Sequence, residues 1–223
     1  MSALVGASGQ NKRYFLFDAS GTITTGGTPQ LILPQHQSRS YLLIQNNAAS
    51  GSLFVEFGSA RGTASITNGV VTGVTITNAG FNFTKPPTVK FWGGGNAGNT
   101  SYLGLNQPGG EAPHNLVTAG APAHGIAVMT GSAPNLSVAS VTLTNGTKND
   151  PLGGIGYVIA PFVQFINSDL DPYGAAVPSA TVGIQLLPGA VGKLEYNGTM
   201  TPTDPVSIFG ATTGQAFTCK WMQ

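Results

Sequence analysis

The amino-acid sequence predicts an all-β protein, in which a discontinuous β-sandwich or barrel domain carries an inserted second β-domain built from two internal repeats. Charged residues are scarce, at 8% of the chain, against about 25% in typical globular domains. Glycine (32 residues) and proline (15 residues) are abundant, and both disfavour long helices. Apolar and polar residues alternate with the period of two that indicates strands, and no long window keeps an uninterrupted helical period.

Ten segments carry this alternation, each bounded by the Gly, Asn or Pro residues that favour turns. In chain order the expected strands are Tyr14–Phe17, Ser40–Gln45, Leu53–Phe57, Val70–Thr77, Thr88–Trp92, Ser137–Thr144, Phe162–Ile166, Thr181–Leu187, Val206–Phe209 and Ala216–Lys220. Almost no helix is expected beyond a turn or two.

The middle of the chain contains an internal repeat. Gly73–Asn78 (GVTITN) resembles Ser140–Asn145 (SVTLTN), and a glycine-, aromatic- and proline-marked stretch follows in each copy. In that stretch the matching positions are Gly80, Phe83, Pro87, Val89 and Phe91 in the first copy, and Gly154, Tyr157, Pro161, Val163 and Phe165 in the second. The second copy carries an insertion near Lys148–Leu152. One such unit cannot bury its own apolar face, so the two copies are expected to pack on each other.

The domain organisation follows from where the repeats stop. Residues 1–61 and 181–223 lack the repeat pattern, and neither flank alone has enough strands for a stable sandwich. We therefore expect the two flanks to form one discontinuous β-sandwich domain. Residues 62–180 form the inserted domain, with copies at about 64–125 and 126–180. The junction at Gly58–Gly62 suits an exposed loop, where insertions are tolerated.

The flanks resemble a known family. Arg39–Asn47 (RSYLLIQNN) followed by Leu53–Gly58 (LFVEFG) is similar to the opening of a small β-domain found in many tailed-bacteriophage virion proteins. The usual continuation of that domain is matched by Gly183–Gly189, Lys193–Tyr196, Pro205–Ala211 and Ala216–Lys220. The inserted copies also look like the glycine- and aromatic-rich repeats of phage structural proteins. The resemblance implies a virion structural role with no catalytic residues, and the large insertion leaves head or tail open.

Several sequence patterns that can mark binding sites are better explained here as ordinary loops and turns. Gly93–Gly98 fits GxGxxG, but no helix pattern follows it to receive a pyrophosphate, so we expect a loop. Of the three histidines, His36, His114 and His124, the last two lie in a Gly/Pro/Ala-rich stretch without cysteine or acidic partners at metal-ligand spacing, and exposed loop positions are expected. Asp169 and Asp171 can offer oxygens to calcium, although a turn is favoured. We expect no cofactor and no metal.

The acidic residues and the single cysteine do not form a pattern that indicates catalysis. The eight acidic residues sit mostly in turn-like contexts, except for Glu56 and Glu195, which lie on expected strands and should point outward. Nothing favours a carboxylate pair at hydrolytic spacing, so we expect no enzyme and no catalytic residues. The single cysteine, Cys219, is expected in a strand core, since no His or acidic residue lies nearby to activate it. The acidic residues are Asp18, Glu56, Glu111, Asp150, Asp169, Asp171, Glu195 and Asp204.

Location and partners follow from charge and from targeting signals. Nine Lys and Arg residues and a net charge of +1 argue against a nucleic-acid footprint. No signal sequence or apolar run of about 20 residues is present, so we expect synthesis in the host cytoplasm and no membrane partner. The N-terminal Met1–Asn11 is polar and is expected to become ordered only against a partner.

Two functions remain. The leading hypothesis is a non-enzymatic capsid decoration or cement protein that binds and stabilises the major capsid shell. Its partners would be the major capsid protein and copies of itself, with a homotrimer expected because decoration sites lie on symmetry axes. An exposed apolar patch on the flanking domain would favour this hypothesis. The alternative is a tail, fibre or head-fibre component that binds host-surface glycans through exposed aromatics, for example Phe81, Phe83, Trp92, Tyr102, Tyr157 and Tyr173.

Overall fold

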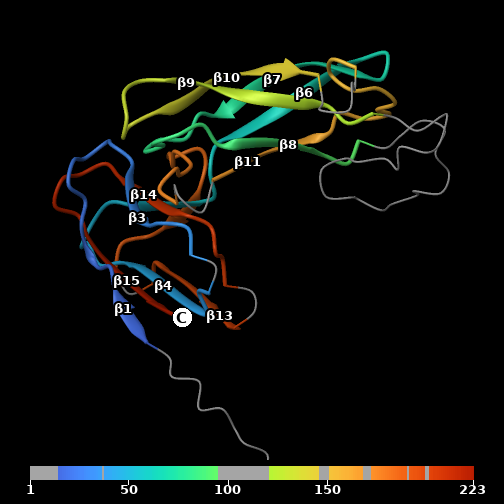
Figure 1. Cartoon of the computed structure of the whole chain (residues 1–223). Coiled ribbons are helices and arrows are strands. Elements are labelled where there is room, and N and C mark those ends of the chain that lie inside the picture. Colours follow the sequence, from blue (N-terminus) through green and yellow to red (C-terminus); the bar gives the residue numbers. More distant parts are fainter. Residues whose placement is uncertain are drawn as a thin grey trace, which may run out of the picture.

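The fold is all-β within the described part of the chain, with strands joined by turns and loops and no helix. The computed structural model describes residues 15–36, 38–94, 121–145, 151–167, 172–189, 191–198 and 201–223. These residues form fifteen strands in three antiparallel sheets (Figure 1). The all-β prediction is therefore confirmed. The described residues hold no helix long and apolar enough to cross a membrane.

Two of the sheets pack face to face as a sandwich. The five-stranded sheet has the order β1-β15-β4-β13, with β2 also paired to β15, and the four-stranded sheet has the order β12-β5-β14-β3. The first contains β1 (Leu16–Asp18), β2 (Gly21–Thr22), β4 (Tyr41–Asn46), β13 (Lys193–Asn197) and β15 (Ala216–Met222). The second contains β3 (Gln30–Leu33), β5 (Leu53–Phe57), β12 (Ile184–Leu186) and β14 (Val206–Gly210). All these strands come from the two ends of the chain.

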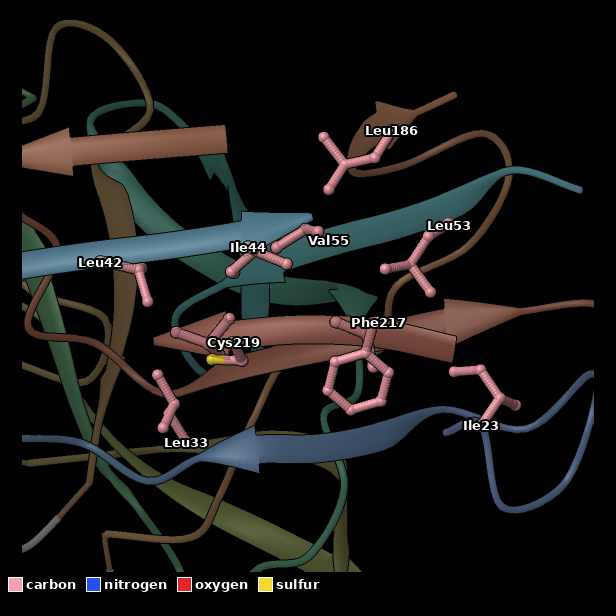
Figure 2. Close-up of a cluster of buried hydrophobic side chains, with 11 residues drawn as sticks. Ile23, Leu33, Leu42, Ile44, Leu53, Val55, Leu186, Phe217 and Cys219 are labelled. Carbon is pink, nitrogen blue, oxygen red and sulfur yellow. The ribbon is translucent and has the colours of Figure 1, made fainter. Parts of the chain in front are cut away.

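Alternation along the strands fills the space between these two sheets. In β4, Leu42 and Ile44 are fully buried while Tyr41 and Leu43 face outward, as a period of two requires. Figure 2 shows the apolar side chains of β4, β5 and β15 gathered into one core. Each fully buried aliphatic side chain contributes roughly 1.5–3 kcal/mol. The buried core residues are Ile23, Leu33, Leu42, Ile44, Leu53, Val55, Leu186, Val206, Ile208, Phe217 and Cys219.

The third sheet has six strands and nearly closes into a barrel. Its order is β10-β9-β8-β11-β6-β7. The two outer strands approach each other, and the Val138 N–H donates to the Ala79 carbonyl at 2.8 Å. Its strands are β6 (Arg61–Thr67), β7 (Val70–Asn78), β8 (Thr88–Trp92), β9 (His124–Thr130), β10 (Ser137–Thr144) and β11 (Phe162–Ile166). The barrel, as we call this sheet, has its own apolar interior.

The two repeats are related by a pseudo-two-fold arrangement. The first copy supplies β6, β7 and β8, and the second supplies β9, β10 and β11 in the same roles. The counterparts are β6 and β9, β7 and β10, and β8 and β11. When each strand is exchanged for its counterpart, the sheet order β10-β9-β8-β11-β6-β7 becomes the same order read from the other edge. The third strand of each copy leaves its own hairpin and pairs with the other copy, β8 against β9 and β11 against β6. The copies are therefore interleaved rather than merely packed side by side.

The aromatic anchors of the repeats strengthen this exchange. Phe83, 1% exposed, exchanges two backbone hydrogen bonds with Leu136 (3.1 and 3.0 Å), next to the second hairpin. Its counterpart Tyr157, 5% exposed, donates its N–H to the Gly69 carbonyl (3.0 Å) in the turn of the first hairpin. Asn68 and Gly69 both have left-handed φ values (51° and 76°), as the tight turn of a two-residue hairpin requires. Each anchor thus fixes the other copy's hairpin.

A polar joint connects the sandwich to the barrel. The Asn78 side chain at the end of β7 accepts the Val177 N–H and donates to the Val177 carbonyl, both at 2.9 Å. The Ala176 N–H donates to the Gly58 carbonyl (2.8 Å), and the Ser207 hydroxyl on β14 donates to the Ala176 carbonyl (2.7 Å). The segment 175–177 is therefore bonded to both bodies.

Some local expectations were wrong. Strand β13 was expected only through the family resemblance, at Lys193–Tyr196, and four strands have no counterpart in the sequence analysis: β2, β3, β6 and β9. The expected strand at Thr181–Leu187 is shorter and covers Ile184–Leu186, because Ser179 and Val182 form a tight bridge just before it. The chain passes from the sandwich to the barrel between Phe57 and Arg61.

Candidate functional site

The ionisable groups of the described residues do not gather into a metal centre. No three of their His, Cys, Asp and Glu side chains lie where they could hold a metal ion. Four of the eight acidic residues are described: Asp18, Glu56, Glu195 and Asp204. The calcium candidates Asp169 and Asp171 lie outside the described residues, as do Glu111 and Asp150.

The two strand carboxylates serve structural contacts. Glu195 on β13 is exposed, accepts a hydrogen bond from the Tyr41 hydroxyl (3.2 Å) and pairs with Lys193 (3.0 Å). These two partners hold the pKa of Glu195 below its usual value, the Lys193 hydrogen bond contributing most. Glu56 points out of the sandwich as predicted, but it is only 7% exposed and forms an ion pair with Arg61 at the joint. The low exposure of this outward-pointing side chain is consistent with the position of its carboxylate beside Gly183.

The histidine and glycine candidates do not form sites within the described residues. His36 is half-buried, with its ring 5.0 Å from that of Trp221. His124 begins strand β9 instead of lying in a loop, so that expectation was wrong. His114 lies outside the described residues, as does most of the Gly93–Gly98 motif.

Cys219 is a core residue. Its side chain has no exposed surface and packs among the apolar residues between the two sandwich sheets (Figure 2). Burial raises the pKa of the thiol to about 12, so the thiol stays protonated and unreactive at neutral pH.

The aromatic residues proposed for glycan contact divide into two groups. Phe83 and Tyr157 are buried in the barrel interior, so core packing accounts for them. Trp92 is half-buried, with the Lys90 ammonium 5.7 Å from its ring, Phe81 is half-buried beside a groove, and Tyr173 is 50% exposed. Tyr102 lies outside the described residues.

The most distinctive surface feature is the edge strand β1. Among the described residues it pairs with β15 on one side only, in the register Leu16–Met222, Phe17–Trp221 and Asp18–Lys220. The Ala19 N–H donates to the Cys219 carbonyl (2.8 Å). Bonded and non-bonded pairs alternate in antiparallel ladders, so Phe17 bonds to β15 while Leu16 and Asp18 turn their backbone groups toward the open edge. This free edge can accept another strand.

Apolar side chains flank the same edge. Phe15 is 58% exposed, Leu16 62% and Phe17 37%. Sheet edges in monomeric proteins are usually guarded by charges, prolines or bulges. The opposite edge of this sheet follows that rule, because β13 carries Lys193 and Glu195. The β1 edge carries one charge, Asp18, which is paired with Lys220.

An aromatic cluster holds β1 in place from within. The Phe17 ring stacks on Trp221, with centroids 4.3 Å apart and planes inclined by 17°. The Arg39 guanidinium lies 5.9 Å from the Trp221 ring centroid. Arg39 is itself 4% exposed and donates to the carbonyls of Pro34 (3.0 Å), Pro202 (2.7 Å) and Asp204 (3.1 Å). Desolvation lowers the pKa of Arg39. These contacts hold Phe17 of β1 against Trp221 of β15.

A second group of exposed apolar side chains lies on the barrel. Val158, Ile159 and Phe162 are each 64–65% exposed. Strand β11, which carries Phe162, is paired on both sides. These residues therefore offer apolar contact without a free backbone edge.

An open groove of about 260 Å³ lies where the sandwich meets the barrel. Its lining residues are Thr24, Thr25, Thr28, Pro29, Gln30, Leu31, Phe81 and Asn82. None of these side chains is ionisable, so the groove is suited to a neutral ligand. Sequence reasoning named Phe81 alone, because the threonines belong to a connection far away in the chain.

The β1 edge was also missed as a site, although its strand was expected. Its signal was the run Tyr14–Phe17 (YFLF), which was assigned as an ordinary strand although all four of its residues are apolar or aromatic. Comparison with known proteins adds no identification: no family model, no curated protein and no solved structure matches the chain.

Proposed function

We propose that this chain is a non-enzymatic bacteriophage virion protein that decorates the capsid and stabilises the shell of the major capsid protein. The observation that carries the proposal is the free β1 edge, with the exposed side chains of Phe15 and Leu16 beside it. Such an edge suits strand addition, in which backbone hydrogen bonds supply affinity and flanking side chains supply specificity.

The distribution of charge supports the same proposal. A net charge of +1 with few ionic groups suits a surface that is buried against neighbours, since charged residues are depleted at interface cores. The two edges of the five-stranded sheet differ, because β1 is free and β13 carries an ion pair. A partner strand is therefore directed to β1. The proposed partners are the major capsid protein and neighbouring copies of this chain, arranged as a trimer.

Copy number in purified virions tests the location. Quantitative mass spectrometry against the major capsid protein is expected to give one copy per capsid subunit, or a simple fraction such as one third, as decoration of a symmetric shell requires. The alternative, a tail, fibre or head-fibre component, predicts far fewer copies. A ratio that low would overturn the decoration proposal.

Binding to capsids that lack the protein tests the edge itself. Leu16→Lys places a charge on the free edge, and the bound amount in a sedimentation assay is expected to fall at least about tenfold. Val191→Lys is the matched control, because Val191 is 84% exposed on the loop before β13. Equal binding by both variants would show that the β1 edge is not part of the capsid interface.

A further inference from the structure

We infer that the groove between the β2–β3 connection and the turn after Gly80 binds the ring of a neutral pyranose sugar. One wall is residues 24–31 of the sandwich, and the other is Phe81 and Asn82 of the barrel. Ligand sites form preferentially between structural units, where concave surfaces arise without distorting either core. This site does not depend on whether the protein sits on the head or the tail.

The lining chemistry selects the ligand class. Its side chains provide three threonine hydroxyls, two amides and one aromatic ring, with Pro29 and Leu31 as the apolar remainder. A phosphate or carboxylate ligand would require a cation, and a divalent metal would require carboxylates. Neither kind of group is among the described residues that line the groove. A sugar ring combines hydroxyls with an apolar C–H face, so it matches both parts of this lining.

The walls are held by their own hydrogen bonds. The Thr24 N–H donates to Gln30 Oε1 (3.0 Å). On the other wall, Phe81 exchanges two backbone bonds with Ala175 (2.9 and 3.0 Å), and Asn82 has a left-handed φ of 60°. Affinity is gained when a site needs little ordering on binding.

Polar groups in the groove are left available. Among the hydrogen bonds of the described residues, none uses the hydroxyls of Thr24, Thr25 and Thr28 or the side-chain amide of Asn82. An amide offers both a donor and an acceptor, and each hydroxyl can do the same. Sugar hydroxyls need this mixture. The volume of about 260 Å³ lies just below the range of about 300–1,000 Å³ for drug-sized ligands, so one ring fits.

Saturation-transfer NMR on the full chain tests the inference. The probes are the methyl α- and β-pyranosides of glucose, galactose, mannose, N-acetylglucosamine and rhamnose, each at millimolar concentration. At least one probe is expected to receive saturation from the protein. Thr28→Val removes a hydroxyl at constant shape, and Asn82→Gly removes the amide while keeping the left-handed backbone accessible. Each is expected to weaken binding about threefold to tenfold.

The matched control is Thr63→Val, an exposed threonine on β6 outside the groove, which is expected to bind as the unaltered chain does. Urea unfolding midpoints verify that all three variants fold. The inference is overturned if no pyranoside receives saturation, or if the Thr28 and Asn82 variants bind as tightly as the control. Weakening in the control to the same extent would also overturn it, because recognition would then lie outside the groove.

Discussion

Asn78→Ala should destabilise the protein more than its position near the surface suggests. The Asn78 carboxamide accepts the N–H groups of Val177 (2.9 Å) and Gly80 (3.0 Å) and donates to the Val177 carbonyl (2.9 Å). Alanine leaves these three backbone groups without their partner. At about 1 kcal/mol for each net hydrogen bond, the free energy of unfolding should fall by about 2–4 kcal/mol.

The repeat supplies the control for this experiment. Asn145 occupies the same place in the second copy, after SVTLT instead of GVTIT, and it is exposed with no side-chain hydrogen bond among the described residues. Asn145→Ala should change stability by less than about 0.5 kcal/mol. Equilibrium urea unfolding measures both variants, with Trp92 reporting on the barrel and Trp221 on the sandwich. Equal losses for the two variants would refute the joint as the cause.

Three further predictions concern the core, the cysteine and an ion pair. Phe83→Ala should lower the free energy of unfolding by about 3–5 kcal/mol, measured in urea, whereas a loss below about 1 kcal/mol would contradict the burial of this anchor. Cys219 should resist iodoacetamide in the folded chain at pH 8 and react once urea unfolds it; rapid labelling of folded protein would count against the buried thiol. Pairing with Lys220 holds the pKa of Asp18 well below its usual value, so this stabilisation is present above pH ~4 and is lost as the pH falls through the lowered pKa. Unfolding midpoints of Asp18→Asn should therefore vary less with acid pH than those of the unaltered chain, and parallel curves would show that the pair contributes nothing.

The sequence predicted strands where one face is apolar and the other polar. Leu53–Phe57, Thr88–Trp92, Ser137–Thr144 and Phe162–Ile166 were predicted at their observed bounds. The missed strands break this pattern. In β6 two of the three inward positions are the small residues Gly62 and Ala64, and Ile66 is the only large apolar one, so the apolar face is hard to recognise. In β9 both faces are apolar, since Ile126 and Val128 are exposed opposite buried Ala127.

The sites were harder to predict than the strands. The free edge of β1 depends on which strand lies beside it, and that strand, β15, lies at the other end of the chain. The groove joins Thr24–Leu31 to Phe81, a contact created only when the barrel is placed on the sandwich. Short-range patterns carry no information about such pairings.

The interleaving of β8 and β11 has a consequence for the history of this fold. A chain with one copy alone would expose the core face of its hairpin and leave its third strand without a partner. It could complete the same six-stranded sheet by associating with an identical chain about a true two-fold axis. Duplication and fusion of the gene for such a homodimer would yield the present order of strands. The difference between Asn78, which bonds to Val177, and Asn145 would then be a later change that attached one copy to the sandwich.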